Sequence, residues 1–290
     1  MPVETPRKNF DRRTTVPVAW PPESTRQETL ADARINRVTG EIRAWYETHA
    51  HEFADADAVE LAFVGQSREF QERLNRFKLW AVDREDLVDL EGKRVLELGA
   101  GHARLAFAYR AMAAYTGVDA AHNLVALGNA RLRDAGLSDR ARLFYGDANS
   151  FEIPERDFDV VCSLGMMCYI PDPRPVVENM VRYLRPGGTL FYDFRVASPL
   201  YSTIRRIKWA LHPPTGGKTF VIRPIDAQSM LRECGLVDVR IRLREFPLLA
   251  ERYAGGGSDW PLSLRNSLAD STLARPFATE AWIFATKPER

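Results

Sequence analysis

Three residues between positions 99 and 119 have the types and spacing of a nucleoside-binding site. Gly99 and Gly101 follow the apolar run Val95–Leu98, and Asp119 lies eighteen residues beyond the second glycine. Glycine has no Cβ, so it lets the backbone turn tightly and lie close to a ligand. A carboxylate at the end of the next strand accepts two hydrogen bonds from ribose hydroxyls. The chemistry that these residues support is the binding of a nucleoside.

A predicted strand, loop, helix and second strand position these residues. Val95–Leu98 has the pattern of a buried parallel strand, His102–Met112 that of a helix, and Tyr115–Asp119 that of the second strand. The free N–H groups at the start of the helix should point at the same place as the loop. Glu97 lies inside the first strand, where a buried carboxylate is costly unless it is hydrogen-bonded. We therefore expect Glu97 to brace the loop or to reach the ligand.

The loop differs from the loop that binds dinucleotides. The dinucleotide fingerprint has a third glycine where this chain has Arg104, because a pyrophosphate lies against the start of the helix. The bulkier residue argues against a pyrophosphate and favours a ligand without phosphates. A nicotinamide-dependent enzyme is therefore disfavoured.

Five motifs follow one another along the chain. They are Val95-Leu96-Glu97-Leu98-Gly99-Ala100-Gly101, the acid Asp119, Gly146-Asp147-Ala148, Phe158-Asp159-Val160-Val161, and the turn Leu184-Arg185-Pro186-Gly187-Gly188. Each alone occurs by chance in many chains, but their order and gaps resemble those of the class I S-adenosylmethionine-dependent methyltransferases of the small-molecule type. The resemblance extends from about Val95 to Lys287.

The resemblance implies a fold and a cofactor. The fold is α/β, a doubly wound and mostly parallel seven-stranded sheet in the order 3-2-1-4-5-7-6, with strand 7 antiparallel and an N-terminal helical cap. The cofactor is S-adenosylmethionine, the product is S-adenosylhomocysteine (SAH), and Tyr46 would close over the cofactor. The residues expected to bind the cofactor are Glu97, Gly99, Ala100, Gly101, Asp119, Asp147, Ala148, Ser163 and Tyr46.

His102 and Tyr169 are the candidate catalytic residues. Methyl transfer from a sulfonium is a one-step in-line displacement, and an amine or hydroxyl acceptor must also lose a proton to a base. His102 is either this base or a helix-start residue that hydrogen-bonds the cofactor carboxylate or solvent. Tyr169 stands where many family members have histidine, and it either orients the acceptor or packs in the wall of the site.

Hydrophobic patterns predict the remaining elements and the domain organisation. A mobile tail, 1–28, precedes a helical cap, 29–90, and the methyltransferase domain, 91–290, whose insertions 196–224 and 247–279 lie beyond strand ends; the first should wall the acceptor pocket. Asp172 and Asp226 should cap helices, the second of which stops at Gly235. The other strands are Ala141–Tyr145, Phe158–Ser163, Leu190–Phe194, Val237–Leu243 and Ala281–Thr286, and the other helices are 122–135 and 173–184.

Composition excludes several kinds of partner. The chain has 40 Lys and Arg against 39 Asp and Glu with no basic block, so no nucleic acid is expected. Arg205–Trp209 is a basic cluster. We interpret it as a solvated helix face in preference to an anion-binding or membrane surface. Neither the three cysteines nor the other histidines have the spacing of a metal site. His49 and His51 are close in sequence, but two residues apart on a helix their side chains would diverge, so no metal is expected.

The sequence shows neither a signal peptide nor an apolar run of the ~20 residues that span a bilayer. We expect a cytoplasmic monomer or homodimer that methylates a small molecule. The expected acceptor atom is oxygen or nitrogen in preference to carbon. Two alternatives remain open: a protein or RNA methyltransferase, and a non-catalytic relative of the fold that binds the cofactor poorly. The acceptor itself is not identified.

Overall fold

The computed structural model describes residues 40–48, 88–196, 198, 203, 220–244 and 278–289 of the chain. The tail 1–28, most of the cap 29–90 and most of the insertions 196–224 and 247–279 lie outside these residues. The same holds for His49, His51 and the cluster Arg205–Trp209.

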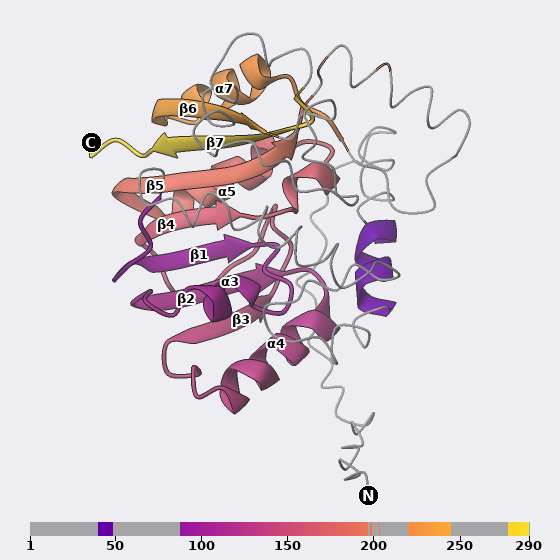
Figure 1. Ribbon diagram of the computed structural model, residues 1–290, viewed down its shortest axis with the longest axis vertical. Coiled ribbons are helices and arrows are strands. Elements are labelled where there is room, and N and C mark those ends of the chain that lie inside the picture. The colour runs from indigo at the N-terminus through magenta and orange to yellow at the C-terminus, as the bar shows by residue number, and fades with distance from the viewer. Residues whose placement is uncertain are drawn as a thin grey trace, which may run out of the picture.

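Seven strands form one sheet in the order β3-β2-β1-β4-β5-β7-β6 (Figure 1). β7 runs antiparallel to β5 and β6, and the other neighbouring strands are parallel. The predicted order and the antiparallel seventh strand are therefore confirmed. The strands are β1 (Arg94–Leu98), β2 (Ala114–Asp119), β3 (Ala141–Tyr145), β4 (Phe158–Ser163), β5 (Leu184–Arg195), β6 (Val237–Arg244) and β7 (Glu280–Thr286).

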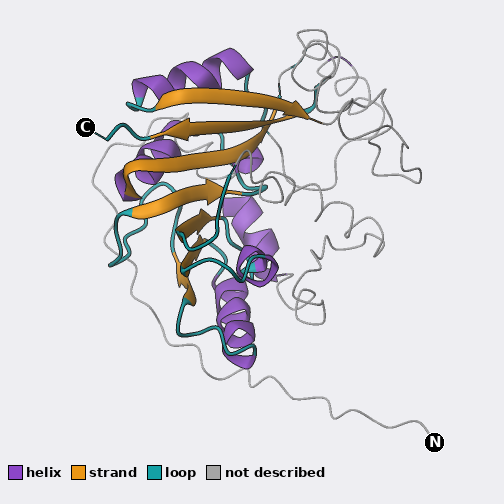
Figure 2. Ribbon diagram, turned by 60° about the vertical axis from the view of Figure 1, so that its left-hand side comes forward, coloured by secondary structure: helices purple, strands orange, loops and turns teal. Residues whose placement is uncertain are grey.

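Helices cover both faces of this sheet (Figure 2). Val95 and Leu96 are neighbours on β1 but belong to different clusters of buried side chains, because successive residues of a strand point to opposite faces. Residues of α5 and α7 pack in the cluster of Leu96, and those of α3 and α4 in the cluster of Val95. The helices are α3 (Arg104–Ala108), α4 (His122–Asp134), α5 (Arg174–Tyr183) and α7 (Pro224–Glu233).

Two of these helices match their predicted bounds to within one residue, and two do not. α4 and α5 confirm the predictions 122–135 and 173–184. The N-cap position of α5 is Pro173 and not Asp172 as predicted, although the Asp172 carboxylate accepts the Arg174 N–H at 3.1 Å from the residue before it. α3 has only five residues, so the prediction of a helix over 102–112 was wrong. Its start is delayed because Ala103 adopts a left-handed conformation, with φ of 69°, which continues the loop.

The start of α7 also corrects the sequence prediction. The helix begins at Pro224, whose fixed φ suits the first helical position, so Asp226 lies in the first turn and is not the capping residue. The Asp226 carboxylate instead pairs with Arg223 at 2.6 Å. Gly235 follows the end of the helix with φ of 83°, as predicted for a residue that stops it.

β5 is longer than predicted, because it begins at Leu184 rather than Leu190. Phe158 of β4 pairs with Leu184 and Val160 pairs with Thr189, so the chain between Leu184 and Thr189 bulges out of the ladder. The predicted turn at residues 184–188 is therefore an irregularity within the strand. Gly188 is required there, because a Cβ would lie 2.7 Å from the Leu184 side chain.

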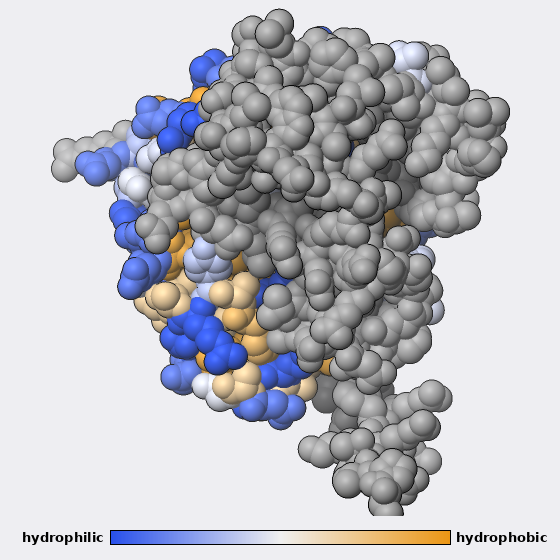
Figure 3. Space-filling model, viewed as in Figure 1, coloured by the Kyte–Doolittle hydropathy of each residue, from blue (hydrophilic) through white to orange (hydrophobic). Residues whose placement is uncertain are grey.

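Residues 40–48 form a helix beyond the ends toward which β1 and β4 point (Figure 1). On the described part of the molecular face in Figure 3, hydrophilic and apolar residues are interspersed. Large apolar side chains that are exposed among the described residues are those of Trp45, Ile225 and Val237. In the part of the chain that the structure describes, no helix has the length and apolar character to cross a membrane.

Candidate functional site

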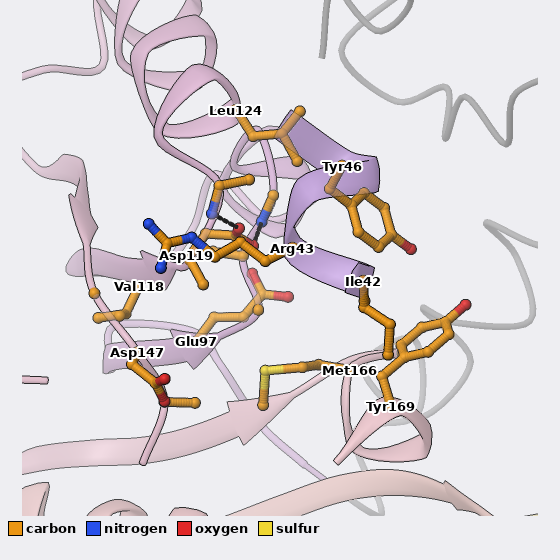
Figure 4. A pocket seen from close by; sticks show the side chains of 18 of the residues that line it. Ile42, Arg43, Tyr46, Glu97, Val118, Asp119, Leu124, Asp147, Met166 and Tyr169 are labelled. Carbon is orange, nitrogen blue, oxygen red and sulfur yellow. Dashed lines mark hydrogen bonds between the residues drawn. The ribbon is translucent and has the colours of Figure 1, made fainter. Parts of the chain in front are cut away.

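A pocket of about 190 Å³ lies at the carboxyl ends of β1, β2, β3 and β4 (Figure 4). Open α/β sheets bind their ligands at this edge. Helix 40–48 supplies the opposite wall through Ile42, Arg43 and Tyr46. The predicted site residues that line this pocket are Tyr46, Glu97, Gly99, Ala100, Gly101, His102, Asp119, Asp147, Ala148 and Tyr169.

Ser163 is the one predicted site residue that does not line the pocket. It is fully buried at the end of β4, in register with Leu98 and Tyr192. Both of these neighbours point to the face that α5 covers, and side chains in register share a face. The pocket wall begins one residue later, at Leu164.

The glycine loop is held in place by the end of β2. The N–H groups of Gly99 and Ala100 donate to the Val118 carbonyl at 2.8 and 3.2 Å. The Asp119 carboxylate accepts the Gly101 N–H at 2.8 Å and the Ala121 N–H at 2.9 Å. One carboxylate thus fixes both the loop and the start of α4.

Both loop glycines have left-handed backbones, with φ of 72° at Gly99 and 55° at Gly101. A Cβ on Gly99 would lie 2.5 Å from the Met166 Cβ, so this glycine makes room for the chain after β4. A Cβ on Gly101 would meet no protein atom within 4 Å, because it would project into the pocket. Gly101 therefore leaves open the space that a ligand against the loop would fill.

Burial raises the pKa of Asp119 above its ordinary value. The N–H groups of Ala121 and Gly101 oppose this shift, and the nearby carboxylate of Glu47 adds to it. A ligand that donates hydrogen bonds to Asp119 would favour its charged form. The position and the electrostatics of this carboxylate suit ribose hydroxyls.

Glu97 belongs to a buried group of charged side chains. The Tyr115 hydroxyl donates to its Oε2 at 2.6 Å, so the expected hydrogen bond to this buried carboxyl is present. Burial raises the pKa of Glu97 to about 7, and Asp119 and Asp193 add to that shift, whereas Tyr115 and Arg104 oppose it. Near neutral pH this carboxyl therefore binds or releases a proton readily, and a ligand cation would favour the charged form.

His102 lines the pocket but is only 3% exposed. Burial lowers its pKa to about 3, and the positive charges of Arg131 and Arg104 contribute. An imidazole with this pKa is neutral at physiological pH and is a weak base. The surroundings of His102 therefore oppose a role in removing a proton.

Aromatic and apolar side chains form the end of the pocket near the 3-10 helix η2 (Met167–Tyr169). The Tyr46 and Tyr169 rings meet edge to face with centroids 6.3 Å apart, and the Met166 side chain extends from this end toward Glu97 (Figure 4). Burial raises the pKa of Tyr46 well above its ordinary value, and Tyr169 adds to the shift. The Phe220 N–H donates to the Cys168 carbonyl at 2.7 Å, which ties the end of the first insertion to η2.

The opposite end of the pocket is formed by the chain after β3. Asp147 accepts the Asn149 N–H and its side-chain amide at 2.7 Å each. The Ala148 carbonyl accepts the side-chain amide of Asn179 on α5 at 3.1 Å. These bonds shape the segment 146–149 into a wall beside Asp119.

Sequence reasoning missed several residues of this site. Arg43 lines the pocket, but nothing in its sequence context predicts that its helix docks there. Asp193 is buried on β5 beside the site and accepts the Gly165 N–H at 2.5 Å. Arg104, the first residue of α3, also lines the pocket, although from the sequence it was considered only as the residue that replaces a glycine.

Comparisons with known proteins agree with this geometry. Residues 95–188 match a protein family described as a methyltransferase domain. A ubiquinone biosynthesis O-methyltransferase of Paracidovorax citrulli is 30% identical over 191 residues, which are 63% of this chain and 79% of that protein. A phosphatidylethanolamine N-methyltransferase of Cereibacter sphaeroides is 33% identical over 101 residues, and the match spans 35% of this chain and half of that protein.

Solved structures share the fold. The magnesium protoporphyrin IX methyltransferase of Synechocystis PCC 6803, solved with bound SAH, aligns with a TM-score of 0.56. The alignment covers 85% of this chain and 98% of that chain, at 13% sequence identity. At this identity the likeness concerns the fold alone.

Proposed function

Because the chain belongs to the class I S-adenosylmethionine-dependent methyltransferases, we propose that it transfers a methyl group to a small molecule, at oxygen or nitrogen rather than carbon. The observation that carries this proposal is the aromatic end of the pocket, where Tyr46 of helix 40–48 meets Tyr169 of η2, and Met166 also lines the pocket. Concave, largely apolar sites of this kind take small ligands. The O- and N-methyltransferases among the relatives support the choice of acceptor atom.

The residues present fit S-adenosylmethionine. Asp119 would hold the ribose hydroxyls, and the segment at Asp147 and Ala148 would meet the adenine. Glu97 would face the amino end of the cofactor, and Gly101 leaves space against the loop. When bound, the cofactor supplies an electrophilic methyl group on a sulfonium.

The remaining chemistry is positioning. In-line displacement needs the acceptor atom held about 3 Å from the methyl carbon, which a closed and rigid site achieves. We assign Tyr169 to orienting the acceptor and Tyr46 to closing the site over the cofactor. His102 is assigned to the cofactor loop and not to proton transfer, because its pKa of about 3 makes it a weak base. An oxygen or nitrogen acceptor can pass its proton to solvent, whereas a carbon acceptor needs stronger activation.

The test is methyl transfer from labelled S-adenosylmethionine into a cell extract. Ultrafiltration divides the extract into low-molecular-weight and macromolecular fractions before the assay, and mass spectrometry identifies the product. We expect label in the small-molecule fraction, and much less label with Asp119→Ala when the cofactor concentration is near the wild-type Kd. Label only in protein or RNA would replace the proposal with a macromolecular methyltransferase. Calorimetric binding of NAD in preference to S-adenosylmethionine would overturn the assignment of the site.

Cofactor affinity is expected to fall as the pH decreases below about 7, by up to about tenfold per pH unit. The ammonium group of the cofactor would lower the pKa of Glu97 from its value of about 7, so binding below that pH would release a proton. Above about pH 8 the amine itself loses its proton, so affinity should be highest between these values. Calorimetry in buffers of different ionisation enthalpy measures the released proton.

Glu97→Gln is the matched variant for this prediction. It should bind the cofactor more weakly, and its affinity should lose the part of the pH dependence that is centred near pH 7. Asp119, whose pKa burial also raises, can still contribute at lower pH. If the variant keeps the wild-type pH dependence, the titrating group is not Glu97.

Turnover is expected to continue in EDTA. The sulfonium carries a positive charge and releases a neutral thioether when the methyl group is transferred, so no metal is needed to activate the leaving group. Among the residues described here, no three His, Cys, Asp or Glu side chains gather as a metal-binding group. Loss of turnover in EDTA and its recovery with magnesium or zinc would contradict this prediction.

A further inference from the structure

Helix 40–48 is attached to the nucleoside end of the pocket by an arginine. The Arg43 guanidinium donates to the hydroxyl of Tyr145, the last residue of β3. Its Cζ also lies 5.3 Å from the centroid of the same ring, within the range of a cation–π contact. Figure 4 shows the Arg43 side chain extending from the helix across the pocket. This side chain therefore spans the region between the helix and the end of β3.

A glutamate attaches the same helix to the start of α4. The N-cap position of α4 is Ala121, whose side chain makes no capping hydrogen bond. The Asn123 N–H donates to the Glu47 carboxylate at 3.1 Å, and the Asn123 side-chain amide donates to the Glu47 carbonyl at 3.1 Å. A carboxylate is stabilised at a helix N-terminus, where N–H groups lack helical partners. Glu47 thus caps a helix that lies 76 residues away in sequence.

Both attachments lie on the β2, β3 and α4 side of the pocket, where Asp119 and the segment 146–149 are placed to hold the nucleoside. A nucleoside in this pocket would have Asp119 on one side and the Arg43 side of helix 40–48 on the other. Ile42, Arg43 and Tyr46 of the helix line the pocket, so movement of the helix would open this end to a ligand. The attachments are exposed to solvent, and exposed polar contacts are individually weak, so they can break and re-form.

We propose that Arg43 and Glu47 are positioning residues that clasp helix 40–48 over the nucleoside end of the site. The clasp sets the rates at which the cofactor enters and SAH leaves. This inference rests on the cofactor site proposed above, but it is independent of the identity of the acceptor. Tyr46 lies on the same helix, so its contact with Tyr169 would move together with the clasp.

The clasp is tested by the kinetics of SAH binding to the full chain, followed by stopped-flow fluorescence or surface plasmon resonance. Tyr145→Phe and Glu47→Gln are the informative variants, because neither residue lines the pocket. Each removes or weakens one attachment without touching the ligand directly. Glu91→Gln makes the same chemical change on an exposed residue outside the pocket lining and is the matched control.

In Tyr145→Phe and Glu47→Gln, we expect the association and dissociation rates of SAH each to increase by about threefold to tenfold. The reason is that each variant loses one hydrogen bond or the charge that strengthens it. The double variant should be faster than either, the control should match wild type, and Kd should change less than the rates. Unchanged rates would overturn the clasp, and so would weaker binding through dissociation alone, which indicates general damage to the site. If SAH fails to bind the wild-type chain, the cofactor site itself is wrong and the clasp falls with it.

Discussion

Asp119→Ala is expected to weaken S-adenosylmethionine binding by about 2–3 kcal/mol, because charge-assisted hydrogen bonds to the ribose are lost. The same carboxylate accepts the N–H groups of Gly101 and Ala121, so the substitution also loosens the loop that faces the ligand. Both effects act in the same direction. Isothermal calorimetry of the wild-type and variant chains measures the change directly.

Asp119→Asn separates the two contributions. The amide oxygen can still accept one backbone N–H, but the negative charge is gone, so its loss of affinity should fall between those of wild type and Asp119→Ala. The ligand-free melting temperatures report the loosening of the loop alone. A cofactor-induced thermal shift that is the same in wild type and Asp119→Ala would refute the assignment of this residue to the ribose.

Gly101→Val is expected to abolish cofactor binding while the sheet stays folded. The new side chain would project into the pocket, since no protein atom lies within 4 Å of a Cβ at this position. The φ of 55° also places a β-branched residue in a left-handed backbone, which costs about 1–2 kcal/mol of stability. Circular dichroism follows the fold, and calorimetry with SAH follows binding.

Gly136→Val is the matched control for this strain. Gly136 has φ of 67° and equally open surroundings, but it lies after α4 and outside the pocket lining. Both variants should lose similar stability, and only Gly101→Val should lose binding. Global unfolding of Gly101→Val beside a folded Gly136→Val would mean that Gly101 serves the structure and not the ligand.

The sheet was predictable because each strand carries its own signal. Val95–Leu98 and Phe158–Ser163 are short apolar runs, and the glycines and acids at their ends mark where the chain turns. α3 was not predictable at its true length. Its apolar residues have helical spacing, but the left-handed backbone of Ala103 follows from how the loop closes and leaves no trace in the sequence.

The residues of the site also include some that the sequence could predict and some that it could not. Asp119 and Gly101 were found because strand ends place them, and the structure brings them together through a hydrogen bond of 2.8 Å. Ser163 is buried outside the pocket lining, whereas the next residue, Leu164, lines the pocket, because successive side chains along a strand point to opposite faces. Arg43 and Asp193 could not be found, because their proximity to the pocket depends on how distant elements pack.

The place of β7 between β5 and β6 has a consequence during translation. The ribosome makes β6 before β7, yet β6 lies at the sheet edge and next to β7. Until residues 280–286 have emerged, the nascent sheet ends at β5, whose Phe191 and Tyr192 are fully buried in the finished protein. An open edge with apolar side chains is a template for pairing with other chains. The growing sheet therefore keeps an edge that can pair with other chains until β7 joins it.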